Sequence, residues 1–290
     1  MLTLLEAGSA SRPPLCGQFA SVWNRKVHFH SRGHGRPMLL LHGNGSLGEE
    51  ILSCFPEIAG VRWIAPDRPG YGFSQPLENG NEDPVTMGKW AAAFLDEIGI
   101  RHATVVAHSI AAGAALCLSG DMSRRVARLV LLAPFCRPTP HRRMLGLRLA
   151  VAPVVGGFIR RHVLPALLPL FRRHIVESMV APNPVPPWLQ HFPIEHAARP
   201  ESITMVAAEL RRFNDGMSSA APRLKVKIPT VAVFGEADET APPSWHKPWL
   251  RRHVANLTMI SLEGVGHAVH HAAPATVLQV ILGKPCPIHP

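Results

Sequence analysis

The chain carries short runs of apolar residues in which polar and apolar positions do not alternate. Five of these runs span residues 37–41, 61–65, 103–107, 126–132 and 230–234. Such runs are typical of parallel strands that are buried on both faces of a sheet. Residues 84–98 have helical spacing instead, and further helical stretches separate the runs. The alternation of strands with helices predicts an α/β architecture.

The pattern changes between residues 137 and 221. Here the strand-like runs stop, and prolines interrupt apolar, arginine-rich stretches of helical character. We therefore predict a core formed by residues 1–136 and 222–290, with residues 137–221 inserted as a helical block over one edge of the sheet. The apolar positions of this block would either line a pocket for an acyl or alkyl group or seal the block onto the core.

The composition is that of a folded protein with one large core. Of the 290 residues, 47% are hydrophobic and 17% are charged, which excludes a disordered chain. No apolar run is long enough for a membrane-spanning helix, and the N-terminus lacks the features of a secretory signal. Five scattered cysteines without a CxxC pair favour free thiols over a disulfide framework or a zinc site. We therefore expect a soluble, cytoplasmic protein.

The net charge of +10 raises the question of an anionic partner. Residues 137–221 contain 11 arginines against 5 acidic residues. These arginines occur in dispersed pairs without interleaved aromatic residues, so the sequence favours no nucleic-acid partner. Weak attraction to an anionic membrane surface is an alternative to arginines that simply face solvent. The oligomeric state does not follow from the sequence.

Ser109 is the strongest candidate for chemistry, because it lies between a predicted strand and a helix of small residues. The nucleophile-elbow motif G-x-S-x-G is matched by Ala107-His108-Ser109-Ile110-Ala111, with alanine in both glycine positions. A sharp turn of this kind lifts the serine hydroxyl clear of the sheet, where a substrate can reach it. A serine between small residues at a helix N-terminus is otherwise commonly only a helix cap.

A serine nucleophile needs a general base, and the base needs a carboxylate that orients it. Asp238 follows the last of the five apolar runs, and His267 follows another apolar stretch. The order Ser, Asp, His is expected when successive strand ends supply the three groups. We predict Ser109 as nucleophile, His267 as general base and Asp238 as the group that orients it. His267 is preferred to His270 and His271 because the glycine before it allows a tight loop.

Acyl transfer also needs hydrogen-bond donors for the oxyanion of the tetrahedral intermediate. Ile110 follows the serine at a helix N-terminus and would supply one backbone N–H group. Asn44 lies in the loop His42-Gly43-Asn44-Gly45 after an earlier strand and would supply the other. The alternative is that this loop is an ordinary turn.

Taken together, these segments resemble the α/β-hydrolase fold superfamily. The likeness rests on Leu39-Leu40-Leu41-His42-Gly43-Asn44-Gly45, Asp67-Arg68-Pro69-Gly70-Tyr71-Gly72-Phe73-Ser74, His108-Ser109, Asp238 and Gly266-His267. It implies a mostly parallel sheet of about eight strands with helices on both faces, and a helical cap between the sixth and seventh strands. It also implies the three catalytic roles given above, and a structural role in their loop for Asp67 and Arg68.

The serine at the elbow argues against the haloalkane dehalogenases and epoxide hydrolases of this superfamily, which use aspartate there. The resemblance therefore predicts a serine hydrolase that cleaves a small, largely apolar carboxylic ester through an acyl-enzyme. Its partner would be the small-molecule ester, and the reaction would need no metal or organic cofactor. C–C bond hydrolysis, lactone hydrolysis, perhydrolysis and acyl transfer on the same residues stay open, as does a non-catalytic, ligand-binding role.

Overall fold

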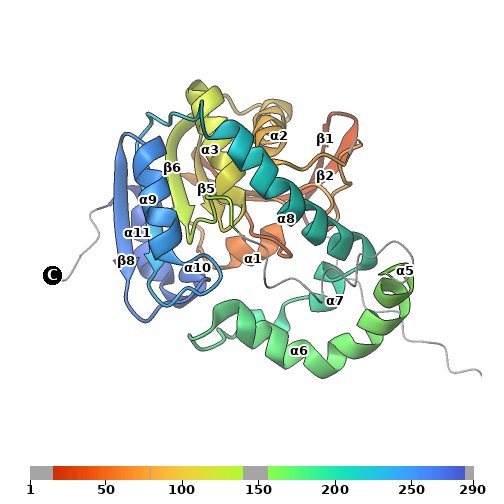
Figure 1. The fold of residues 1–290 in the computed structure, drawn as a ribbon. Coiled ribbons are helices and arrows are strands. Elements are labelled where there is room, and N and C mark those ends of the chain that lie inside the picture. The colour runs from red at the N-terminus through yellow and green to blue at the C-terminus, as the bar shows by residue number, and fades with distance from the viewer. Residues whose placement is uncertain (1–15, 79, 140–155, 285–290) are drawn as a thin grey trace, which may run out of the picture.

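The computed structural model describes residues 16–78, 80–139 and 156–284, and their centre is a single twisted sheet (Figure 1). Within these residues the sheet has eight strands, in the order β1-β2-β4-β3-β5-β6-β7-β8. The strands are β1 (Gln18–Val22), β2 (Arg25–Gly33), β3 (Arg36–Leu41), β4 (Val61–Pro66), β5 (Ala103–His108), β6 (Val126–Leu132), β7 (Thr230–Gly235) and β8 (Leu257–Leu262). β2 pairs antiparallel with both β1 and β4, whereas the six strands β4-β3-β5-β6-β7-β8 are parallel to one another.

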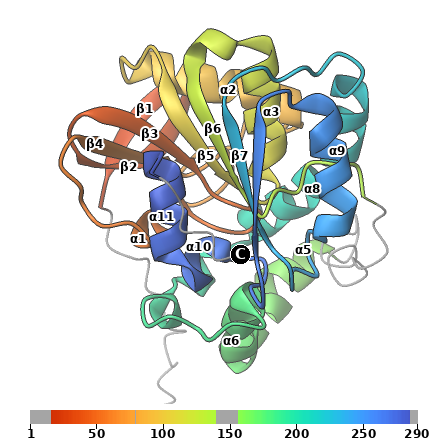
Figure 2. The same cartoon turned by 90° about the vertical axis from the view of Figure 1, so that its left-hand side faces the viewer.

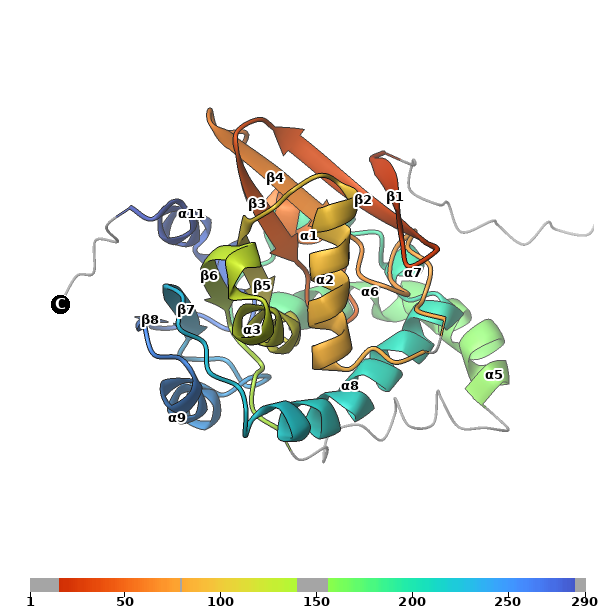
Figure 3. The ribbon, with the colours of Figure 1, turned by 90° about the horizontal axis from the view of Figure 1, so that it is seen from above.

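Helices cover both faces of the sheet (Figure 3). One face carries α2 (Pro84–Glu97), α3 (Ala111–Asp121) and α9 (Pro243–His253). The opposite face carries α1 (Gly48–Ser53) and α11 (Pro274–Leu282), with α10 (Val269–Ala272) just before α11. The predicted fold class, a mostly parallel sheet of eight strands between two layers of helices, is confirmed.

The side chains of the central strands explain why the sequence shows uniform apolar runs there. In β3, Leu39 and Leu41 pack into the cluster beneath α2 and α3, whereas Met38 and Leu40 pack into the cluster beneath α1 and α11. Successive side chains of a strand point to opposite faces, so a strand covered on both sides needs an apolar residue at every position. All four side chains are almost completely buried.

The segment between β6 and β7 contains helices, as the sequence predicts. These are α5 (Gly156–Phe158), α6 (Leu164–Val180), α7 (Ile194–Ala197) and α8 (Pro200–Ala220). Val176 and Val180 of α6 pack in one cluster with Leu47 and Ala268 of the core, so part of the apolar surface seals this segment onto the core. Figures 1 and 2 show α6 on the same side of the molecule as α10. The division into units 1–136, 137–221 and 222–290 stays a prediction, and residues 140–155 lie outside the described ranges.

Two expectations from composition can be compared with the structure. Among the described residues the cysteines form no disulfide, and Cys286 lies outside them. None of the described helices has the length and hydropathy that crossing a bilayer requires. The cytoplasmic location stays a prediction.

Candidate active site

Ser109 lies at the sharp turn between β5 and α3, with its backbone in an uncommon conformation. Its φ is 56°, in the left-handed region that residues with a side chain rarely adopt. The Ser109 N–H donates to the carbonyl of Leu132 at 2.9 Å, and its carbonyl accepts from the N–H of Phe135 at 3.0 Å. Strain of this kind costs about 1–3 kcal/mol and persists where the surroundings fix it. Ala107 and Ala111 are completely buried on either side of this turn.

The structure brings the three predicted catalytic side chains together. His267 Nε2 lies 2.8 Å from Ser109 Oγ, and His267 Nδ1 lies 2.7 Å from Asp238 Oδ2. The other carboxylate oxygen of Asp238 accepts the backbone N–H groups of Thr240 and Ala241, at 2.8 and 2.9 Å. A carboxylate only accepts, so Nδ1 carries the ring proton and Nε2 is left to accept the serine proton.

The loop that carries His267 is fastened to the segment after α6. Asn183 Oδ1 accepts the N–H of Gly266 at 2.9 Å, and Asn183 Nδ2 donates to the carbonyl of Gly264 at 3.0 Å. A Cβ on Gly266 would lie 1.9 Å from the carbonyl oxygen of Ala181, so only glycine fits this close approach. The position of the candidate base therefore depends on the helical segment between β6 and β7 as well as on the core.

His108, the residue before the serine, contacts the same loop from the other side. Its Nε2 donates to the carbonyl of His267 at 3.2 Å, and the two rings lie 4.9 Å apart. Burial, together with the neighbouring imidazoles of His270 and His267, holds the pKa of His108 well below its usual value. His108 is therefore a neutral group that positions the loop of His267.

The loop after β3 approaches the elbow closely, as the predicted oxyanion hole requires. A Cβ on Gly43 would lie 2.9 Å from His108 Nδ1 and 3.3 Å from Ser109 Cβ. Asn44 follows directly, and its side-chain amide donates away from this contact, to Glu209 Oε2 at 2.9 Å. Ile110 occupies the position before the first residue of α3. Ile110 is thus next to Ser109 in the chain, and Asn44 belongs to the loop that approaches Ser109 in space. Their role as oxyanion donors stays a prediction.

Arg68, Tyr71 and Glu209 form a buried polar network around Asn44 that the sequence did not reveal. Arg68 donates to both carboxylate oxygens of Glu209 and to the carbonyl of Gly43, the last at 3.0 Å. Tyr71 donates to Glu209 Oε2 at 2.7 Å. Burial alone would raise the pKa of Glu209, but the Arg68 guanidinium and the other donors outweigh it and hold that pKa below its usual value. Glu209 is therefore an ionised group of α8 that fixes the loop of Asn44.

The loop residues Asp67 and Arg68 have different partners. Asp67 accepts the N–H groups of Gly48 and Phe73, at 2.9 and 3.0 Å, and so holds its own loop, as the family resemblance implies. Arg68 instead reaches Glu209 in a helix that is far away in the sequence. The motif pointed to Arg68, but no sequence signal distinguishes Glu209 from the other acidic residues of its segment.

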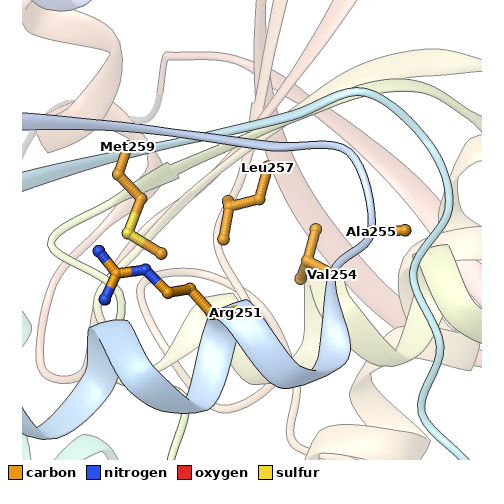
Figure 4. A pocket seen from close by; sticks show the side chains of 5 residues that line it. All are labelled: Arg251, Val254, Ala255, Leu257 and Met259. Carbon is orange, nitrogen blue, oxygen red and sulfur yellow. The ribbon is translucent and has the colours of Figure 1, made fainter.

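A cavity elsewhere on the molecule lies apart from these residues (Figure 4). It has a volume of about 350 Å³ and is lined by Arg251, Val254, Ala255, Leu257 and Met259. Leu257 begins β8, whereas Asp238 and His267 follow the ends of β7 and β8. This cavity therefore lies at the opposite edge of the sheet, and the candidate active site is the edge at which the parallel strands end.

The family follows from sequence comparison as well as from the fold. A model of the alpha/beta hydrolase family matches residues 38–280. The chain therefore belongs to the alpha/beta hydrolase family. The resemblance inferred from the motifs is confirmed, and membership of this family supports the expectation of an enzyme of the hydrolase class.

Individual relatives are similar over part of the chain or in fold. A 2-hydroxymuconate semialdehyde hydrolase from Pseudomonas putida is 34% identical over 110 residues, which cover 37% of this chain and 39% of that relative. An esterase from Exiguobacterium antarcticum superposes with a TM-score of 0.73 at 18% identity, covering 92% of this chain and 98% of the esterase. Epoxide hydrolase VrEH1 from Vigna radiata superposes with a TM-score of 0.70 at 22% identity, covering 92% and 96% of the two chains. The structural likenesses show the fold alone, and the sequence match spans about two fifths of its relative.

Proposed function

We propose that the protein is a serine hydrolase that cleaves small, largely apolar carboxylic esters through an acyl-enzyme. The observation that carries the proposal is the hydrogen-bonded series Asp238, His267, Ser109, with contacts of 2.7 and 2.8 Å. The strained backbone of Ser109, with φ at 56°, supports a nucleophile rather than a helix cap.

The proposed reaction follows from the protonation states that these contacts select. His267 Nε2 takes the proton of Ser109 while Oγ attacks the ester carbonyl, and Asp238 stabilises the imidazolium that forms. The backbone N–H groups of Asn44 and Ile110 would hold the oxyanion. His267 then gives its proton to the leaving alcohol, and a water activated by the same imidazole cleaves the acyl-enzyme. Each proton is carried by His267, so the proposed steps need no cofactor.

The charges near the site support a neutral substrate. Among the residues that the structure describes, Arg68 is the cation that donates to the loop of Asn44, and Glu209 neutralises it with both carboxylate oxygens. Both side chains are buried. A substrate carboxylate that approached this loop would have to compete with Glu209 for the guanidinium, whereas an apolar ester would not.

C–C bond hydrolysis is a second candidate, favoured by the similarity to the 2-hydroxymuconate semialdehyde hydrolase. The same serine, histidine and aspartate would serve it. Its substrate would carry a carboxylate, which needs a cation that is not already paired. The pairing of Arg68 with Glu209 therefore ranks the neutral ester first.

Hydrolysis of p-nitrophenyl esters of increasing acyl length tests the proposal, with 2-hydroxymuconate semialdehyde assayed in parallel. We expect turnover of the esters, loss of that turnover in Ser109→Ala, and retention in Ser119→Ala. Ser119 is a matched control because it lies in the adjoining helix α3, where its hydroxyl donates to the carbonyl of Ala115. Ester turnover that survives Ser109→Ala would refute the mechanism, and turnover of the semialdehyde alone would replace the ester by the second candidate.

A further inference from the structure

A cluster of metal-ligating side chains lies beside the elbow, outside the proposed reaction. Cys54 directly follows α1, and His270 and His271 belong to α10. One ligand atom of each of these three residues lies within 4.8 Å of the other two. Cys54 Sγ and His271 Nδ1 are 3.2 Å apart. Segments far apart in the sequence thus bring together one sulfur and two imidazole ligands.

Glu50 gives this cluster a buried negative charge. Its Oε1 lies 2.9 Å from His270 Nε2 and 2.6 Å from His271 Nε2. Among the described residues, the ion-pair partners of Glu50 are these two histidines, so no permanently charged group compensates its carboxylate.

The two imidazoles share a carboxylate contact that is common among metal-binding histidines. A histidine that binds a metal commonly donates its other ring N–H to a carboxylate, which fixes the tautomer. Glu50 accepts in this way from Nε2 of both rings, which leaves the Nδ1 lone pairs. The Nδ1 atom of His270 is buried and has no hydrogen-bond partner in the described structure. Such a buried lone pair is available to an ion.

We propose that Cys54, His270 and His271 bind a zinc ion that joins α1 to α10, with Glu50 orienting both imidazoles and balancing the charge. Sulfur and imidazole ligands suit Zn²⁺, at about 2.3 and 2.0 Å. Tetrahedral geometry then separates sulfur from nitrogen by about 3.5 Å, close to the 3.2 Å between Cys54 and His271. On binding, the S–H bond breaks, the S–Zn bond forms and the proton leaves to solvent, without a change in oxidation state. A water completes the four ligands.

Residues that line a cavity adjoin the cluster. A cavity of about 630 Å³ is lined in part by Ser53 and Trp188. Ser53 precedes Cys54, and the Trp188 indole stacks on the His271 ring at 15° between planes. The ring of His270 also lies 4.4 Å from that of His108, next to the elbow. The ion would therefore stabilise the helix that follows the His267 loop, and would take no part in the ester chemistry.

Cobalt titration of metal-free protein tests the site, because Co²⁺ replaces Zn²⁺ and reports a thiolate ligand by its near-ultraviolet charge-transfer band. We expect one Co²⁺ per chain, a thiolate band that Zn²⁺ abolishes, and a higher Tm with Zn²⁺. Cys54→Ser should remove the band and His271→Ala should weaken binding at least tenfold. Glu50→Gln should weaken it by about 10- to 100-fold. His102→Ala, at an exposed histidine, is the matched control and should bind as the wild type does.

Several results would overturn the proposal. One is the absence of a thiolate band in the wild-type protein, and another is a band that persists in Cys54→Ser. Equal losses in His102→Ala and His271→Ala would show adventitious binding to surface histidines only. If the Cys54 variant does not fold, Zn²⁺ affinity of the wild type decides, because a Kd weaker than about 10 µM is incompatible with a structural site. These readouts are independent of ester turnover.

Discussion

The side-chain amide of Asn44, in the loop after β3, donates to the carboxylate of Glu209, in helix α8, at 2.9 Å. The same carboxylate binds Arg68, which in turn donates to the carbonyl of Gly43. A helix from the segment between β6 and β7 therefore fixes the loop that is proposed to bind the oxyanion. This arrangement makes the geometry of the candidate oxyanion hole dependent on a residue that does not contact the substrate ester group.

Glu209→Gln tests this dependence. The amide keeps the shape of the side chain but loses the charge that holds Arg68, so we expect kcat to fall about tenfold with little change in KM. Affinity for a trifluoromethyl ketone, which forms a tetrahedral oxyanion, should fall by the same factor, whereas affinity for the corresponding methyl ketone should not.

Glu82→Gln is the matched control. Glu82 is a buried carboxylate that pairs at 3.0 Å with Arg212, which lies in α8 like Glu209. It should lower stability without changing the preference for the tetrahedral ligand. Equal effects of the two variants on that preference would reduce Glu209 to a general anchor of α8.

Asp238→Asn should lower kcat by about 10,000-fold while the protein stays folded. The amide retains the size of the carboxylate and can still accept from Thr240 and Ala241, but it no longer selects the tautomer in which Nε2 of His267 accepts. Steady-state kinetics and circular dichroism together check this. A variant with more than about a tenth of wild-type kcat would show that Asp238 does not orient the base.

Gly266→Ala should disconnect the His267 loop from the segment after α6. The new methyl group would meet the carbonyl of Ala181 at 1.9 Å, so the loop must move. We expect a loss of at least about 2 kcal/mol in unfolding free energy and at least a tenfold loss in kcat. Gly264→Ala is the control, since no atom lies within 4 Å of its added carbon and only its φ of 68° opposes the change. Activity equal in the two variants would contradict the dependence on this contact.

His246 makes stability depend on pH. Burial lowers its pKa to about 4, and its Nδ1 accepts the N–H groups of Cys136 and Arg137. The unfolded chain binds a proton at about pH 6.5 and the folded chain only near pH 4, so stability falls as the pH decreases through this window. Between pH 7 and 5 the loss from this group is about 2 kcal/mol.

His246→Asn retains an acceptor but cannot be protonated, so its unfolding free energy should change less over this pH range than that of the wild type. Urea unfolding at both pH values measures the difference. His102→Asn, at an exposed position, should keep the wild-type dependence. Parallel behaviour of the wild type and His246→Asn would mean that His246 does not contribute.

The fold and the candidate triad could be predicted from the sequence because both follow from local patterns. A strand covered on both faces, such as β3 with Met38 to Leu41, must be apolar at every position. Ser109 directly follows β5, and Asp238 and His267 lie in the loops after β7 and β8, so the edge at which these parallel strands end brings them together. The glycine at position 266 is likewise a local signal, because it indicates a tight loop before His267.

The network around Glu209 could not be predicted, because it joins a motif residue to a helix surface without a local signal. Arg68 and Glu209 are 141 positions apart, and their pairing depends on how α8 crosses the core. The contacts of Glu50 with His270 and His271 span even longer separations, of 220 and 221 positions. The predicted attraction of the arginine-rich segment to anionic membranes stays a prediction.

The central claim is that Ser109 becomes acylated, and mass spectrometry of the rapidly quenched reaction with a p-nitrophenyl ester tests it most directly. We expect the intact mass to rise by one acyl group, with peptide mapping that places the group on Ser109 and no adduct in Ser109→Ala. An adduct on another residue, or ester turnover without any adduct under conditions that trap the burst phase, would contradict the account.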